Sequence, residues 1–387
     1  MRLTVNAVLG AAMLALMACG REQVQQANVV RADSAGVRIV TSTGRDTVLP
    51  WRFDTIGVLS DSLGEPWLFT GVSPQYVITD RAGRTYVFER EPAIRRFGRD
   101  GRFERNVGRK GGAPGEMELP FQLLQQGDSI AVLDPGRNAL VRWGPDLEPI
   151  ADIPLRGGFE GVMRVAFRTG GLWQMVSSYD STGNIAVLRG DTTGETVLAR
   201  LYEPVPKNPR MLTGCGGRVT LTQPNFFARS IHWDAEGARA LVYAGPNYEL
   251  ALYEGNRLLA SVRRDLPTRS PTIDDLRRQF PDGLKLQIPG AECTIPLSEL
   301  MAGPTLEGTM PFAFGVVLLS DGSMWVQRSV RNEKPAVLDV FGSDGAYAGT
   351  VRGYHLPVGL LPNGELLVPI DDEESGGLVI ARMRVLR

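Results

Sequence analysis

The side chains of this 387-residue chain that could perform chemistry are few and far apart. Its two histidines, His232 and His355, have no His or Cys neighbour at the spacing of a metal-ligand pair, which argues against a transition-metal site. The sequence also contains no Gly-x-Ser-x-Gly motif that would present a nucleophilic serine. We therefore assign no catalytic residue and expect no metal and no cofactor.

A glycine-rich run from Gly108 to Gly115 has the composition of a phosphate-binding loop. Such a loop would lead into a helix whose first residues include Lys-Ser or Lys-Thr. Here the chain continues as Glu116-Met-Glu-Leu-Pro120, which does not begin a helix. The run is therefore interpreted as a turn that joins two strands.

The strongest local charge feature is basic and extends from Arg95 to Lys110, where only Asp100 and Glu104 oppose it. The whole chain has a formal net charge of −1, so no global field favours nucleic acid. An anionic glycan or lipid head group could bind this patch; the alternative is an exposed outer strand without a ligand. The basic residues are Arg95, Arg96, Arg99, Arg102, Arg105, Arg109 and Lys110.

The N-terminal segment 1–18 is organised as a signal peptide, because Arg2 precedes an apolar run too short to span a membrane. Leu16-Met-Ala-Cys19 resembles the lipobox of bacterial lipoproteins, which implies cleavage before Cys19 and lipidation of Cys19, for example with palmitate. Gly20 resembles the residue that follows this cysteine in lipoproteins of the outer membrane. Residues 19–35 are polar and predict a flexible tether, so we expect a lipid-anchored protein that faces the periplasm or cell surface.

Two further cysteines, Cys215 and Cys293, remain once Cys19 carries lipid. In an oxidising compartment these two residues can form a disulfide, whereas two buried free thiols are the alternative. The compartment favours the disulfide.

The elements that must position these residues are short strands that follow glycine turns. Six such turns recur, and three of the five separations between their glycines are 42 to 44 residues. A period of about 40 to 50 residues with about four strands per unit is typical of a β-propeller blade. The glycines are Gly83, Gly127, Gly170, Gly237, Gly322 and Gly364.

The pattern predicts an all-β, six-bladed propeller over residues 36–387, built from four-stranded antiparallel blades. Segments 202–228 and 264–311 interrupt the period and are interpreted as insertions. Pro271 to Pro281 carries the signals of a helix in the second insertion. After Gly364 only two strands remain, so we expect the N-terminal strand Gly36–Thr41 to complete the last blade and close the ring.

The run Asn106 to Pro120 resembles the glycine loop between blades of the NHL-repeat family, although Met117 replaces its usual Phe. The overall plan resembles bacterial six-bladed β-propeller lipoproteins. This resemblance implies a binding or protein-interaction scaffold with no shared reaction, and we expect a monomer whose partner is an envelope protein or glycan. The alternative is a hydrolase or lyase, similar to the calcium-dependent lactonases, with a divalent cation at the central channel. Asp80, Glu89 and Asp134 could face that channel.

Overall fold

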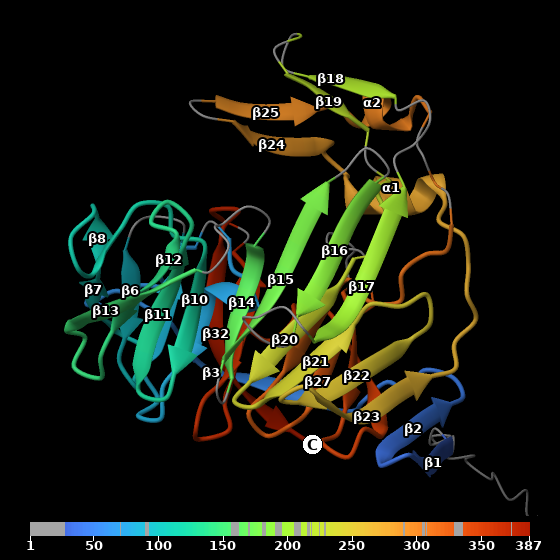
Figure 1. The fold of residues 1–387 in the computed structure, drawn as a ribbon, viewed down its shortest axis with the longest axis horizontal. Coiled ribbons are helices and arrows are strands. Elements are labelled where there is room, and N and C mark those ends of the chain that lie inside the picture. The colour runs from blue at the N-terminus through green and yellow to red at the C-terminus, as the bar shows by residue number, and fades with distance from the viewer. Residues whose placement is uncertain are drawn as a thin grey trace, which may run out of the picture.

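The structure is a computed structural model, and it contains the expected all-β, six-bladed propeller (Figure 1). It describes residues 28–387 except 70, 90–92, 156–161, 169–170, 180–182, 190–195, 205–209, 215–216, 218, 224, 228–229, 289–290, 304–305, 307, 329–335 and 373.

Each blade is an antiparallel sheet with four strands in sequential order from the channel outward, and the sixth borrows its outer strand from the N-terminal region. Blade one contains β4 (Val77–Thr79), β5 (Thr85–Phe88), β6 (Ile94–Phe97) and β7 (Phe103–Val107); blade two contains β10 (Gln122–Gln126), β11 (Ser129–Asp134), β12 (Ala139–Trp143) and β13 (Pro149–Pro154); blade three contains β14 (Val162–Arg168), β15 (Gly171–Tyr179), β16 (Gly183–Arg189) and β17 (Val197–Pro204). Blade four contains β20 (His232–Glu236), β21 (Arg239–Tyr243), β22 (Glu249–Glu254) and β23 (Arg257–Arg264); blade five contains β26 (Gly315–Leu318), β27 (Met324–Gln327), β28 (Val337–Phe341) and β29 (Tyr347–Arg352); blade six contains β30 (Gly359–Leu360), β31 (Leu366–Asp371), β32 (Leu378–Leu386) and β3 (Arg52–Val58).

The propeller has two faces that differ in their connections. Because neighbouring strands run in opposite directions, the turns after the first and third strands of every blade lie on one face, called here the turn face. Connections between blades, including both insertions, lie on the other, called here the insertion face. The short helix η1 (Pro74–Tyr76) leads into β4 from the insertion face.

The glycines at the first turn of five blades share one backbone conformation, which explains why glycine recurs there. Gly83, Gly127, Gly237, Gly322 and Gly364 have φ between +60° and +83°, the left-handed region in which a side chain is strained. The periodic sequence signal is therefore a backbone requirement at the turn face.

Hydrophobic clusters fill the interfaces between all neighbouring blades. In the interface of blades one and two, for example, Tyr86 and Phe88 meet Val132 and Trp143 in one buried cluster. Apolar residues of this kind also occur between every other pair of neighbours. Burial of these faces is what makes the blades one cooperative ring, since no single sheet can cover both of its faces alone.

The glycine-rich run between blades one and two is a structural joint, as the sequence indicates. The short strands β8 (Arg109–Lys110) and β9 (Glu116–Met117) pair within it. Gly108 has φ +73°, and a Cβ atom there would lie 2.7 Å from the Met117 side chain and 3.0 Å from Trp143. Glycine is therefore needed for packing at this joint.

Both insertions combine into one small unit on the insertion face, called here the cap. It lies above the upper ends of β15, β16 and β17 in Figure 1. The predicted helix is confirmed as α1, with Thr272 and Asp275 forming a reciprocal capping box. Leu212, Leu276 and Ile295 belong to its own hydrophobic cluster. The cap contains β18 (Met211–Gly214), β19 (Val219–Thr222), α1 (Ile273–Gln279), β24 (Leu284–Ile288), β25 (Ala291–Ile295) and α2 (Leu297–Met301).

A strand from the N-terminal region closes the ring, as predicted, but that strand is β3. The prediction that Gly36–Thr41 supplies it is wrong. β3 pairs antiparallel with β32 and is the outer strand of blade six. β2 (Val37–Thr43) instead pairs in parallel with β23 and extends blade four. The alternating apolar residues of β2 made it the stronger candidate, whereas most of β3 is exposed and carries a weak pattern.

Residues 28–58, called here the strap, cross the outer edges of three consecutive blades. β1 (Asn28–Ser34) forms a hairpin with β2, so this part of the predicted tether is a strand. Between the strands, the Leu49 N–H donates to the Thr350 carbonyl of blade five at 2.9 Å. The strap therefore connects blades four, five and six (Figure 1).

An ionic network, buried on the ring side and partly exposed at Asp46, fixes the strap to the ring. The Asp46 carboxylate accepts hydrogen bonds from Arg264 of blade four, at 3.0 Å, and from Arg328 of blade five. The fully buried Asp339 lies 2.9 Å from Arg264 and 3.1 Å from Arg328. Tyr248 donates a further hydrogen bond to Asp339 at 2.8 Å. Both arginines thus meet two carboxylates in a low-dielectric setting, where each charge needs its partners.

Candidate functional site: the central channel

A cavity of about 670 Å³ occupies the axis of the propeller. Its described lining comes from β4, β10, β14, β20, β26 and β30, which are the innermost strands of all six blades. It also includes turn-face residues such as Arg81, Gly127 and Gly237, so the cavity reaches that face. A volume of this size is within the usual range for small-molecule pockets.

The innermost strands are held in register by hydrogen bonds between blades. Gln122 in blade two both donates to the Val165 carbonyl, at 2.7 Å, and accepts from its N–H, at 2.9 Å. Thr79 donates to the Leu360 carbonyl at 3.2 Å, which joins blades one and six. These contacts satisfy backbone groups that would otherwise face the channel without a sheet partner, and they connect neighbouring blades at its wall.

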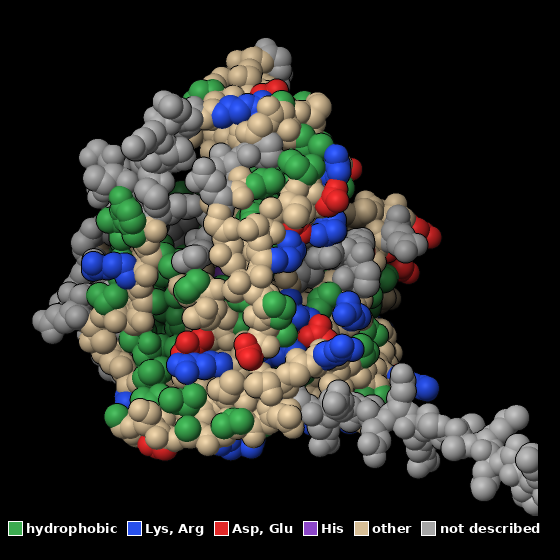
Figure 2. Space-filling view, turned by 90° about the vertical axis from the view of Figure 1, so that its right-hand side faces the viewer, with side chains coloured by type: hydrophobic (Ala, Val, Ile, Leu, Met, Phe, Trp, Pro, Cys, Tyr) green, Lys and Arg blue, Asp and Glu red, His purple; other side chains and the backbone are tan. Residues whose placement is uncertain are grey.

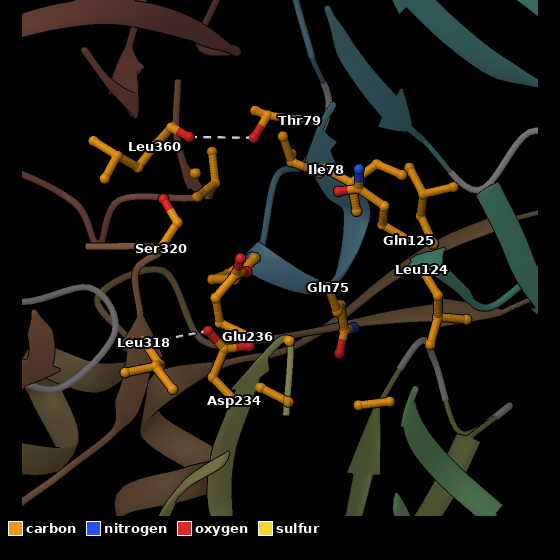
Figure 3. A pocket seen from close by; sticks show the side chains of 18 of the residues that line it. Gln75, Ile78, Thr79, Leu124, Gln125, Asp234, Glu236, Leu318, Ser320 and Leu360 are labelled. Carbon is orange, nitrogen blue, oxygen red and sulfur yellow. Dashed lines mark hydrogen bonds between the residues drawn. The ribbon is translucent and has the colours of Figure 1, made fainter. Parts of the chain in front are cut away.

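Two carboxylates distinguish the blade-four side of the cavity. Asp234 and Glu236 are two residues apart on β20 and therefore project to the same side of the strand. The Asp234 carboxylate accepts a hydrogen bond from the Leu318 N–H at 3.0 Å, which fixes its position (Figure 3). Figure 3 shows Gln75 and Gln125 approaching the pocket from another side.

The electrostatic environment of Glu236 differs from that of a solvated carboxyl. Desolvation raises the pKa of Glu236 above its ordinary value, and the neighbouring negative charge of Asp234 raises this pKa further. The ionised form of Glu236 is therefore stabilised less than that of a freely solvated carboxyl group. A positively charged ligand group would reverse this effect by stabilising the ionised form.

The three acidic residues that the sequence offered for the channel have different positions. Asp80 lines the cavity, but its carboxylate already accepts from Arg84 at 2.6 Å. Glu89 pairs with Arg95 at 2.5 Å and is absent from the described lining. Asp134 is fully buried in blade two, where it accepts the Glu118 N–H at 2.7 Å. Only Asp80 thus faces the channel.

Sequence reasoning missed Asp234 and Glu236 because it assigned them to a turn. β20 in fact continues to Glu236, and its polar residues alternate with Trp233 and Ala235. That period-two pattern of His232, Asp234 and Glu236 was the available signal. It could indicate one polar side of a strand but not that this side faces a channel.

The basic patch is divided between internal ion pairs and exposed side chains. Arg96 pairs with Glu104 and Arg109 pairs with Glu116, both at 2.6 Å, besides the Arg95–Glu89 pair. Arg99, Arg102, Arg105 and Lys110 are exposed, as is the paired Arg109, and the binding role of the patch stays a prediction.

Charges of both signs also mix elsewhere on the surface. Figure 2 shows the side of the molecule that is at the right in Figure 1, and acidic and basic side chains lie interspersed there. This side therefore presents no large field of one sign to a partner.

The remaining sequence candidates lie apart from the channel. Cys293 is buried in β25 of the cap, whereas Cys215 and Cys19 lie outside the described residues. His232 Nε2 lies 2.6 Å from the Ser230 hydroxyl, and His355 lies 3.3 Å from Asp371. Within the described residues, no three His, Cys, Asp or Glu side chains are grouped to hold a metal ion. No helix in the described part of the chain is long and apolar enough to cross a membrane.

Fold and site together define a six-bladed β-propeller with a polar central channel. The fold is similar to that of a protein assigned as exported in Bacteroides fragilis, with a TM-score of 0.52 and 11% identity over 90% of this chain and 100% of the other. A member of the DUF4221 family from Bacteroides vulgatus gives a TM-score of 0.47 and 8% identity over 94% of this chain and 100% of the other. No protein-family model and no curated protein matches the sequence.

Proposed function

We propose that this protein is a lipid-anchored binding module of the bacterial cell envelope that holds a small ligand in its central channel. The observation that carries this proposal is the cavity of about 670 Å³, which all six innermost strands line. A wall that combines aliphatic side chains with polar groups in fixed positions is typical of a preformed ligand site. The hydrogen-bonded wall would limit the entropy lost on binding.

The envelope location rests on the N-terminal sequence and on the exit point of the chain. Segment 1–18 resembles a lipoprotein signal that ends before Cys19. The strap begins at Asn28, at the outer edge of the blade-four sheet, so an anchor that precedes it is attached at the rim of the propeller and away from the axial cavity. The exported Bacteroides protein of the same fold is consistent with this location.

Cys19→Ala tests the anchor. We expect this variant to lose palmitate labelling and to leave the membrane fraction, whereas the control Gly20→Ala, which keeps the cysteine, should retain both. A Cys19→Ala variant that stays in the membrane fraction would show that the lipobox interpretation is wrong.

Gln125→Trp tests the channel, because an indole at this lining position would fill part of the cavity. Ligands found by thermal-shift screening should bind the wild-type protein and lose at least about tenfold in affinity for the variant. Leu119→Trp, at a position 60% exposed and outside the lining, is the matched control. Equal binding to both variants would place the ligand elsewhere.

The alternative function, a divalent-cation-dependent hydrolase or lyase, requires a metal ion in the channel. Elemental analysis of the purified protein distinguishes the two: stoichiometric calcium or zinc would favour the alternative over a binding module.

We also propose that Cys215 and Cys293 form a disulfide that fixes the two insertions to each other. Support comes from Gly214, the neighbour of Cys215, because a Cβ atom placed there would lie 3.6 Å from the Cys293 sulfur. Such a bridge would stabilise the cap by about 2–4 kcal/mol. Thiol titration of the denatured, unreduced protein should find neither cysteine reactive, and two reactive thiols would remove the bridge.

A further inference from the structure

The outermost strand of the blade-four sheet, β1, has one backbone edge that is open to a further strand. In the described part of the chain, β1 pairs with β2 alone (Figure 1). The hairpin turn, residues 35–36, has positive φ at both positions, as in a type I′ turn, so Ser34 and Val37 form the closing hydrogen-bonded pair. Because hydrogen-bonded and non-hydrogen-bonded pairs alternate, every second residue of β1 directs its N–H and C=O groups outward. These residues are Val29, Arg31 and Asp33.

The outer edges of the other blades are irregular, whereas β1 is regular. A bulge shifts the register where the outer strand joins blades one, two, three, five and six. The pairing of β1 with β2 continues without a shift from Asn28 to Ser34. Bulges twist a sheet edge and protect it against pairing with another chain. The β1 edge therefore lacks a protection that the outer edges of the other blades have.

The side chains on the β1 edge are complementary to those of a second β1 strand. When two copies pair antiparallel about a two-fold axis at Ala32, Arg31 of each copy lies opposite Asp33 of the other. Both residues have outward backbone groups, so this register also forms hydrogen bonds. An axis at Arg31 would instead place two arginines opposite each other, which is unfavourable.

The charges next to this edge continue the same alternation. Arg31 pairs with Asp344 of its own copy at 2.6 Å. Asp33 lies opposite the exposed Arg38 of β2. Acidic and basic side chains would therefore alternate across the joint between two copies, which favours a second copy of this chain as the partner of the edge.

We propose that two copies of this chain associate through β1, which joins their blade-four sheets into one continuous sheet. Backbone hydrogen bonds and the Arg31–Asp33 pairs hold the copies together. Ala32 meets its counterpart on the axis, where the close approach of the strands requires a small side chain. Val30, which is 61% exposed, lies against Ser34 of the second copy. This inference is independent of the channel and of lipidation, and its alternative is the monomer expected from the sequence resemblance.

The test is sedimentation equilibrium of the chain that starts at Gly20, which contains every described residue and carries no lipid. The wild-type chain should form a dimer at micromolar concentrations, as expected of a small interface. Arg31→Asp and Asp33→Arg should each weaken dimerisation at least about tenfold, because each places like charges opposite each other. The variant with both substitutions should dimerise within about threefold of the wild type. Asp54→Arg, the same change at an exposed position of β3, whose pairing contains a bulge, is the control and should leave dimerisation unchanged.

Recovery in the double variant separates the proposed register from other effects. The Arg31–Asp344 pair is lost in both Arg31→Asp and the double variant, so its loss cannot account for a recovery. A wild-type chain that stays monomeric up to its solubility limit would overturn the proposal. Dimerisation that neither single variant weakens would place the contact outside β1, and a double variant as weak as the single variants would overturn the assigned register. Circular dichroism checks that each variant keeps the strand content of the wild type.

Discussion

The strap seam and the central channel both use carboxylates from the same part of the ring, but they use them differently. At the seam, the partly exposed Asp46 and the buried Asp339 are each paired with Arg264 and Arg328. In the channel, Asp234 and Glu236 line a cavity, and desolvation raises the pKa of Glu236. Carboxylates that pair with buried arginines stabilise the fold, whereas a carboxyl group with a raised pKa opposes folding when it is ionised. Substitutions at the two places should therefore have opposite consequences.

Removal of the strap should have the largest effect. A chain that starts at Leu59 lacks β3, so β32 becomes an unpaired outer edge and the ring is open. We expect this truncation to be unfolded by circular dichroism. A chain that starts at Gly44 keeps β3 and should still fold, at lower stability, because only the blade-four extension is lost. A folded, monomeric chain from Leu59 onward would contradict the assigned closure.

Asp339→Ala should be the most destabilising single substitution in this comparison. It leaves Arg264 and Arg328 without their buried partner and should cost about 3–5 kcal/mol in the free energy of unfolding. Chemical denaturation measures this loss. Glu254→Ala, which removes an exposed pair with Arg257, is the control and should cost less than about 1 kcal/mol. Similar losses for both would mean that the network contributes little.

The seam should also make stability depend on acid pH. Burial alone would raise the pKa of Asp46, but hydrogen bonds and charge from Arg328 and Arg264 outweigh burial and lower this pKa below its ordinary value. A depressed carboxyl pKa stabilises the fold above the ordinary value, and the stabilisation is lost as pH falls below about 4. Urea denaturation between pH 6 and pH 3 should therefore show declining stability, with a shallower decline for Asp46→Asn. An unchanged slope would exclude Asp46 as a contributor.

Glu236→Gln should have the smallest effect on stability and the opposite sign. Because its pKa is raised in the folded protein, ionised Glu236 opposes folding at neutral pH, and removing the charge relieves this. Because Glu236 is exposed at the end of β20, solvent screens its charge, and we expect the variant at pH 7 to be equally stable or slightly more stable, by less than about 0.5 kcal/mol. Thermal unfolding without ligand measures the difference, which should vanish once wild-type Glu236 is protonated. A large loss would assign Glu236 a structural role like that of Asp339.

Much of the architecture could be predicted from local signals. The turn glycines revealed the blade period because the same turn in each repeat needs a residue that tolerates positive φ. Thr272 and Asp275 indicated α1 because a capping box forms between residues close in the sequence and satisfies the first N–H groups of the helix. The closing strand was assigned wrongly because β3 is mostly exposed and its apolar pattern is weak. β2 has the stronger apolar pattern, but it pairs with the outer edge of blade four.

The sequence by itself determined the repeat, the fold class and the two insertions, since each depends on spacing and backbone preference within short segments. Only the tertiary structure decided which charges are compensated. Asp46 meets Arg264 and Arg328 from more than two hundred residues away, and Asp234 and Glu236 face Gln75 across a channel that exists only when all six blades close. Electrostatic partners are set by distance in space, so sequence spacing could not distinguish carboxylates that pair with buried arginines from those that line the cavity.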